Sequence, residues 1–450
     1  MLTIPVRPLW RAAAAMVSVL AALMYAAPAA WAVPSMSRQT GYECSRCHTV
    51  FPELTPYGRA FKLGGYTTSS PKFDEKPLIE RLPVSAVMQA ARTSTASTTA
   101  GGTDPAEFPQ DRKNIVQGAG LYWGGKITDN IGALVQYNYD GIEKKWGMEM
   151  FDARYADSTS VAEKELVWGV SLNNNPTVSD IYASTPQWSF PNAETASPAR
   201  PAATAVDMTL ASQVGGVGVY GLWNDLVYVE VAGYRNAKTK ALRALALSLP
   251  IETVVDGTAP YWRLALQQRW GAHSAAIGTY GLVAKVLSDP ANPAAGSNRF
   301  RDLAFDANYQ FIEGDHTAST HATWINEKRN WRSSYAQGLT SSPDGTLKTL
   351  RADVIYHYRR QWGGGLQFFR TSGSSDDLLY NTGDALFGSS SGSPNSRGYV
   401  AQLNYLPWNN LKLSLRYTAY SQFNGAKSDY TPGRSASDNN NVQVMAWLMF

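Results

Sequence analysis

Apolar and polar residues alternate with a period of two along most of this 450-residue chain. In residues 411–419, Leu, Tyr and Ala occupy the odd positions, whereas Lys, Ser, Arg and Thr occupy the even ones. Residues 131–139 and 303–311 repeat the pattern with aromatic residues on the apolar face. Successive side chains of a strand point to opposite faces. Segments of about ten residues with this alternation are typical of strands in membrane-spanning barrels.

Sixteen such segments can be counted along the chain. They are centred near residues 88, 120, 135, 151, 167, 217, 231, 265, 279, 306, 321, 355, 367, 401, 416 and 445. Short turns such as 127–130 and 406–410 alternate with long loops such as 94–114, 173–210 and 372–396. This alternation is typical of outer-membrane barrels, whose long loops lie outside the cell. The predicted fold class is mainly β: a 16-stranded antiparallel outer-membrane β-barrel with both chain ends in the periplasm.

The ends of the chain carry further signals. Arg7 and Arg11 precede an uncharged run, and Ala-Trp-Ala at 30–32 resembles a cleavage site, which predicts a signal peptide over residues 1–32. An uncleaved membrane anchor is the alternative, although the run is short for a span of about 20 residues. The last predicted strand ends on Phe450, and this resembles the terminal strand by which bacterial outer-membrane barrels are recognised for assembly. The net charge of +4 is small for this length and argues against a nucleic-acid-binding surface.

The only two cysteines, Cys44 and Cys47, are followed at once by His48 in the stretch CSRCH. C-x-x-C-H is the attachment pattern of c-type haem, in which both thiols bind one porphyrin and the histidine is the proximal iron ligand. One covalently attached haem c is therefore predicted, with these three residues as its binding site. A redox-active C-x-x-C or a disulfide does not need the histidine. A structural zinc site usually takes a fourth ligand, which this cluster lacks.

The distal iron ligand is not determined by the sequence. Met36, eight residues before Cys44, is the nearest sulfur donor and is the ligand that we favour. A five-coordinate iron is an alternative. The other donors considered are Met88, His321, His357, Met445 and Met449.

A short helix is predicted after the motif. Thr55 would be its N-cap, Pro56 would occupy its first turn and Gly64 would close it. Tyr57 and Phe61, four residues apart, would share one face. These rings would pack either against the porphyrin or against the barrel, and both alternatives stay open.

Three parts of the chain are predicted: the signal peptide over 1–32, an α-helical monohaem cytochrome c-like domain over 33–83, and the barrel over 84–450. The middle part has only about 50 residues, which is too few to bury a haem fully. We therefore expect it to lie in or against the periplasmic mouth of the barrel and to use the barrel wall.

The combination of signal peptide, single haem motif and sixteen-stranded barrel resembles the fused cytochrome–porin family, and residues 36–67 carry the likeness. Members of that family include the outer-membrane iron oxidases of Fe(II)-oxidising bacteria. The resemblance implies a location in the outer membrane of a Gram-negative bacterium. It also implies that electrons from extracellular Fe(II) pass through the haem to a periplasmic c-type cytochrome or another periplasmic carrier. Cys44, Cys47 and His48 match the haem-binding positions of the family.

No iron-binding residues can be carried over from the family, so candidates come from ligand chemistry alone. Fe(II) accepts carboxylate ligands, and solvated loop charge is the alternative for each acidic residue. The acidic loop residues are Asp104, Glu107, Asp111, Asp376, Asp377, Asp429 and Asp438. Two other functions remain open: an electron conduit with a different donor or acceptor, and a solute porin with a structural or sensory haem.

Charged residues are also expected on the lumen face of the barrel, where they would line a water-filled pore. They are Glu230, Arg263, Asp306, Asp353, Lys412 and Arg416. By analogy with general porins, the loop 173–210 is expected to fold into the barrel as a constriction.

Overall fold

The computed structural model describes residues 35–98, 110–142, 144–182, 200–210, 214–236 and 253–449. The predicted signal peptide and Phe450 lie outside the described residues. No helix in the described part of the chain is long and apolar enough to cross a membrane.

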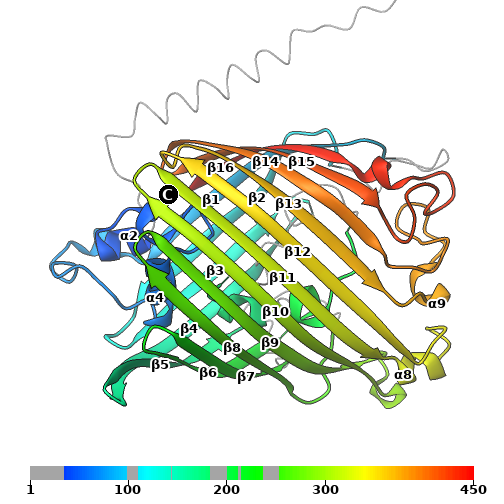
Figure 1. Ribbon diagram of the computed structural model, residues 1–450, viewed down its shortest axis with the longest axis horizontal. Coiled ribbons are helices and arrows are strands. Elements are labelled where there is room, and N and C mark those ends of the chain that lie inside the picture. Colours follow the sequence, from blue (N-terminus) through cyan, green and yellow to red (C-terminus); the bar gives the residue numbers. More distant parts are fainter. Residues whose placement is uncertain are drawn as a thin grey trace, which may run out of the picture.

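Sixteen antiparallel strands close into one barrel, in which each strand pairs with the next and β1 pairs with β16 (Figure 1). The predicted 16-stranded antiparallel barrel is confirmed, and every strand includes the position at which it was expected to be centred. The strands are β1 (Val84–Thr95), β2 (Ile115–Lys126), β3 (Ile131–Asp140), β4 (Lys145–Val161), β5 (Lys164–Asn173), β6 (Gly215–Trp223), β7 (Val227–Arg235), β8 (Ala259–Trp270), β9 (His273–Leu287), β10 (Ser297–Glu313), β11 (His316–Asn330), β12 (Asp344–Tyr358), β13 (Trp362–Gly373), β14 (Ser396–Trp408), β15 (Leu411–Gln422) and β16 (Asn441–Met449).

The alternation in the sequence becomes an apolar outer face and a polar lumen. On β15, Leu413 and Leu415 are exposed on the outside, whereas Lys412 and Arg416 are buried on the inside. Exposed aromatic side chains gather near the short turns. They include Trp123, Trp270, Tyr358, Trp362 and Trp408.

Tight turns join the strands at one end of the barrel. Ala162 and Glu163 alone connect β4 and β5, and their φ values of 52° and 59° are those of a type I′ turn, which suits the twist of paired strands. The long loops open at the opposite end, where one connection, residues 141–144, is also short.

The helices are short and belong either to the segment before β1 or to the connections between strands. They are α2 (Ser35–Thr40), α3 (Cys44–Cys47), α4 (Pro56–Leu63), α5 (Leu78–Arg81), α6 (Pro176–Ser179), α8 (Arg332–Ala336) and α9 (Asp377–Tyr380), with the single turns η2 (Ala205–Thr209), η3 (Pro293–Ala295) and η4 (Ala436–Asn439). In Figure 1, α2 and α4 lie at the opposite end of the barrel from α8 and α9.

Helix α4 begins and ends where its sequence predicts. The hydroxyl of Thr55 accepts a hydrogen bond from the backbone N–H of Gly58 at 3.1 Å, and Gly64 is the C-cap. The two aromatic residues of this helix have separate environments: Phe61 is buried and packs edge-on against Tyr66, whereas Tyr57 lies beneath the guanidinium of Arg46.

The N-terminal segment, residues 35–83, packs into the short-turn end of the barrel. Gln39 accepts a hydrogen bond from the backbone of Lys126 at 2.8 Å, and the hydroxyl of Tyr220 donates to the carbonyl of Leu63 at 2.6 Å. The segment is therefore in direct contact with the barrel wall, as expected. Strand β1 begins at Val84, the residue at which the barrel was expected to begin.

The described parts of the long loop between β5 and β6, residues 174–182 and 200–210, fold into the lumen, as expected. The backbone N–H of Ala205 donates to Glu327 on β11, and that of Val206 donates to Asp302 on β10, both at 2.6 Å. We call these two described parts, residues 174–182 (which include helix α6) and residues 200–210, the inner loop.

Candidate functional site

A cavity of about 440 Å³ separates the N-terminal segment from the inner wall of the barrel. Cys44, Cys47 and His48 all line it, and Met150 and Trp447 are among the residues of the opposing wall. Its volume lies within the range of roughly 300–1,000 Å³ that is typical of cofactor and ligand pockets. The fold therefore places all three residues of the C-x-x-C-H motif on one internal cavity.

The two cysteines form a single helical turn, α3, which is held in place by the following helix. The backbone N–H of His48 donates to the carbonyl of Cys44 at 2.9 Å and closes the turn. Thr55 donates its backbone N–H to Cys47 at 2.9 Å and its hydroxyl to Arg46 at 2.7 Å. Because residues three apart share one side of a helical turn, both thiols can face the same partner.

Both cysteines are free thiols rather than a disulfide. Burial raises the pKa of Cys44, and burial together with the nearby Cys44 raises the pKa of Cys47 to about 11. Reactive C-x-x-C dithiols instead have a lowered thiol pKa. The electrostatics of this turn therefore do not resemble those of a redox-active dithiol.

The imidazole of His48 has the orientation expected of a metal ligand held by its second nitrogen. Nδ1 lies 3.2 Å from the carbonyl oxygen of Pro52, which fixes Nδ1 as the donor and leaves Nε2 with a free lone pair. Burial also lowers the pKa of His48, which favours the neutral ring that binds metals. The ring of Phe51 packs against this imidazole and also edge-on against Trp447, with ring centroids 5.1 Å apart in each pair.

Glu53 ties the loop after the motif to strands β10 and β11. Its carboxylate accepts hydrogen bonds from Thr49 at 2.5 Å, Gln310 at 2.8 Å and Ser319 at 2.8 Å, and it lies 3.1 Å from Nε2 of His321. Burial raises the pKa of Glu53, but the charge of His321 and these hydrogen bonds outweigh burial and lower it to about 2. The carboxylate is therefore a charged anchor between the motif and the barrel.

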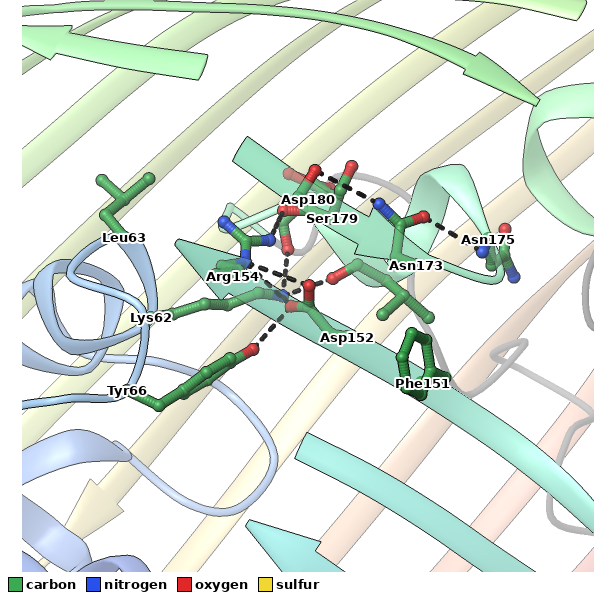
Figure 2. A network of polar contacts seen from close by, with 12 residues as sticks. Lys62, Leu63, Tyr66, Phe151, Asp152, Arg154, Asn173, Asn175, Ser179 and Asp180 are labelled. Atoms are coloured by element: carbon green, nitrogen blue, oxygen red, sulfur yellow. Dashed lines mark hydrogen bonds and ion pairs between the residues drawn. The ribbon is translucent and has the colours of Figure 1, made fainter. Parts of the chain in front are cut away.

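A second anchor joins α4 to β4 and to the inner loop. Figure 2 shows Lys62 and Tyr66 extending from the N-terminal segment toward Asp152, which Arg154 also contacts at 2.9 Å. Lys62 also donates to the carbonyl oxygens of Val178 and Asp180. Because Arg154 donates to the carbonyl of Ser179, the segment, the wall and the loop meet in one network.

Sequence reasoning missed the residues that make these anchors. The sequence indicated no role for Arg59 and Lys62 of α4, yet both are buried, and Arg59 donates to Gln310 at 3.0 Å. The charged face of an amphipathic helix normally meets water. Here it meets polar groups of the lumen, and the only signal for this in the sequence was the polar face of the strands.

The charged residues predicted on the lumen face lie there, but several of them contact residues from other parts of the chain. Arg263 contacts Asp306 on β10 at 2.7 Å and Asp180 of the inner loop at 3.8 Å. Lys412 lies over the ring of Trp447 and donates to the carbonyl of Phe51 at 3.3 Å. The expectation that these residues simply line a water-filled pore is thus wrong for Arg263 and Lys412, because the inner loop and the N-terminal segment occupy that space.

Three of the described acidic loop residues considered as iron ligands have local structural roles. Asp111 accepts from Thr95, Asp376 caps α9, and Asp438 forms a capping box with Ser435. Asp104 and Glu107 lie outside the described residues. Within the described ranges, no group of three or more His, Cys, Asp or Glu side chains is arranged to hold a metal ion.

The predicted distal-ligand donors divide by position. Met88 is on the outer face of β1, and Met445 is packed in a cluster with Trp447. The ring nitrogens of His321 face Glu53 and Asp353. Donors on the cavity wall are Met36, His321, His357, Met449 and, in addition to those predicted, Met150.

Comparisons with known proteins give distant structural likeness only. No protein-family model matches the chain, and no curated protein sequence matches it either. Among solved structures, the chain is similar to OmpF of Salmonella typhi in complex with daunomycin (10% identity, 82% of this chain, 97% of that chain, TM-score 0.46). It is also similar to the outer membrane channel DcaP of Acinetobacter baumannii (11%, 82%, 96%, 0.46) and to the outer membrane protein OmpT of Vibrio cholerae (9%, 82%, 98%, 0.42). The assignment of the barrel rests on the strand pairings of this chain itself.

Proposed function

We propose that this chain is a monohaem c-type cytochrome fused to an outer-membrane barrel and that it carries electrons across the outer membrane. The observation that carries the proposal is the C-x-x-C-H motif on the wall of an internal cavity that the N-terminal segment shares with the barrel. The apolar outer face and the aromatic residues near the short turns support a membrane location, because outer-membrane barrels carry both features.

The residues around the cavity suit a haem c. Cys44 and Cys47 would hold it covalently, and His48 would be the proximal ligand through Nε2. Lys412 and Arg416 on the wall match the negative charge of the two propionate groups. Met36, also on the wall, is a candidate distal ligand. A bound haem supplies a one-electron couple between ferric and ferrous iron.

The packing inside the barrel favours electron transfer over solute passage. The N-terminal segment and the inner loop both form hydrogen bonds with β4, β10 and β11. Polar groups that bridge a lumen hinder solutes, but electrons can pass between sites separated by protein. A solute porin with a structural haem is therefore the weaker proposal.

For the direction of flow, we propose extracellular Fe(II) as the donor and a periplasmic c-type cytochrome or another periplasmic carrier as the acceptor. Oxidation at the outer face keeps poorly soluble Fe(III) outside the cell. Electrons rather than iron then cross the membrane. A conduit for another extracellular donor or acceptor shares the same site, and the experiment below separates the two.

The test is the visible spectrum of the purified protein in lipid vesicles under anaerobic conditions. We expect one c-type haem, and we expect it to be reduced when Fe(II) is added outside the vesicles. The Cys44→Ser, Cys47→Ser double variant should lose covalent haem while the barrel still forms. Reduction by dithionite but not by Fe(II) would reject iron as the donor, and wild-type protein without covalent haem would reject the cytochrome proposal.

A further inference from the structure

His357 is a buried histidine that has no evident structural role among the described residues. It lies on the lumen face of β12, as do Asp353 and Ile355, and its exposed fraction is 2%. Its Nε2 atom is buried, and no described residue forms a hydrogen bond with it. A buried polar atom without a partner costs free energy, so its presence calls for a reason.

The barrel makes room for this imidazole. Gly363 lies directly opposite His357 in the pairing of β12 with β13. A Cβ atom on Gly363 would collide with Cδ2 and Nε2 of the ring. The ring therefore occupies the space over a glycine on the lumen side of the wall, and its residue lines the same cavity as Cys44, Cys47 and His48.

Hydrogen bonds and strand register bring the loop of His48 to the part of the wall that carries His357. The ring of His48 bonds to Pro52, and the next residue, Glu53, accepts a hydrogen bond from Ser319. On β11, Ser319 lies two residues from Thr317, which is directly opposite His357. The loop that fixes the proximal histidine is thus anchored beside the part of the wall that carries His357.

Met150 and Met449 also line the cavity, and two further donors on its wall are less suited than His357. Both ring nitrogens of His321 are engaged, at 3.1 Å by Glu53 and at 3.0 Å by Asp353. Met36 lines the cavity, but its terminal methyl group packs against Gly124 of β2.

We propose that Nε2 of His357 is the distal ligand of the haem iron, opposite His48. The inference rests on the proposed function, because it needs the haem. It differs from the sequence-based choice of Met36, which would give histidine–methionine ligation. The two alternatives differ in a measurable property, since methionine ligation raises the reduction potential of a c-type haem relative to histidine.

The experiment compares the ferric and ferrous haem spectra of the full-length protein in detergent for wild type, His357→Gln, His357→Met and Met36→Leu. The control is His316→Gln: this histidine lies next to Thr317 on β11 but is exposed and bonded to Tyr356. Covalent haem content is measured in every variant, so that loss of haem is distinguished from a change of ligand.

We expect wild-type protein to be low-spin without the near-infrared charge-transfer band of methionine ligation. His357→Gln should become high-spin, and added imidazole should restore the low-spin spectrum. His357→Met should show the methionine band and a higher potential. Met36→Leu and His316→Gln should match wild type.

Three results would overturn the inference. A methionine band in wild type that disappears in Met36→Leu would assign Met36 as the ligand. An unchanged low-spin spectrum in His357→Gln with full haem content would exclude His357. A high-spin wild-type spectrum would exclude both histidine and methionine as the distal ligand. Absence of covalent haem from wild type would instead refute the proposed function on which the inference rests.

Discussion

Replacing Glu53 with Gln should loosen the N-terminal segment without unfolding the barrel. The carboxylate is the acceptor for Thr49, Gln310 and Ser319 and the ion-pair partner of His321. Gln keeps the size of the side chain but loses the charge and presents an NH₂ group to donors that need an acceptor.

The size of the effect follows from the lowered pKa of Glu53. The shift from 4.5 to about 2 means that the folded protein favours the charged carboxylate by about 3 kcal/mol, at ~1.4 kcal/mol for each pKa unit. The folded-state pKa is depressed, so this stabilisation is complete above about pH 4.5 and is lost as the pH falls toward 2. We therefore expect Glu53→Gln at pH 7 to reduce the free energy of opening of the segment by about 2–3 kcal/mol.

Hydrogen exchange read by mass spectrometry measures this opening directly. Peptides from residues 44–66 should exchange roughly 30- to 150-fold faster in the variant, while peptides from β10 and β11 should change little. The matched control is Glu43→Gln, which removes the same charge from an exposed residue whose carboxylate accepts a long hydrogen bond from Ser45, at 3.5 Å. Equal exchange in Glu53→Gln and Glu43→Gln would refute the reasoning, as would faster exchange spread evenly over the barrel.

Two further predictions concern helix α4. Burial lowers the pKa of Lys62 to about 8 although Asp152 opposes the shift, so the unfolded chain holds this proton more tightly than the folded protein. Protease resistance of the N-terminal segment should therefore rise between pH 8 and 10.5, and Lys62→Met should abolish that rise. The charged groups that face Lys62 are Asp152, Arg154, Asp180 and Glu230. Gly58→Ala should reduce covalent haem content at least twofold, because the added Cβ would collide with the carbonyl oxygen of Cys47. The control is Gly64→Ala, whose added Cβ would lie 3.3 Å from the carbonyl oxygen of Ala60 and which should retain haem. Equal haem content in the two variants would contradict the role given to Gly58.

The sequence predicted those features that depend on local patterns. The barrel follows from period-two alternation, because a strand with one apolar face needs an apolar environment on one side only. Helix α4 follows from Thr55 and Gly64, which act within one or two turns of the chain. The position of His357 could not be predicted in this way, because it depends on the register that sets it opposite Gly363 and Thr317. The burial of Lys62 could not be predicted either, since its partners lie on another strand and in a distant loop.

These distant partners also bear on how the inside of the barrel works as a unit. Lys62 belongs to the N-terminal segment, and it donates to the carbonyls of Val178 and Asp180 in the inner loop. Asp180 in turn contacts Arg263, which is held by Asp306 on the far wall. Polar contacts therefore join the N-terminal segment to the inner loop, and they extend from one wall of the barrel to another. Opening the lumen for a solute would break this set of buried charges, each of which needs its partner in a low-dielectric interior. Passing an electron leaves every one of the contacts in place, and for this reason the packing agrees with an electron carrier better than with a channel.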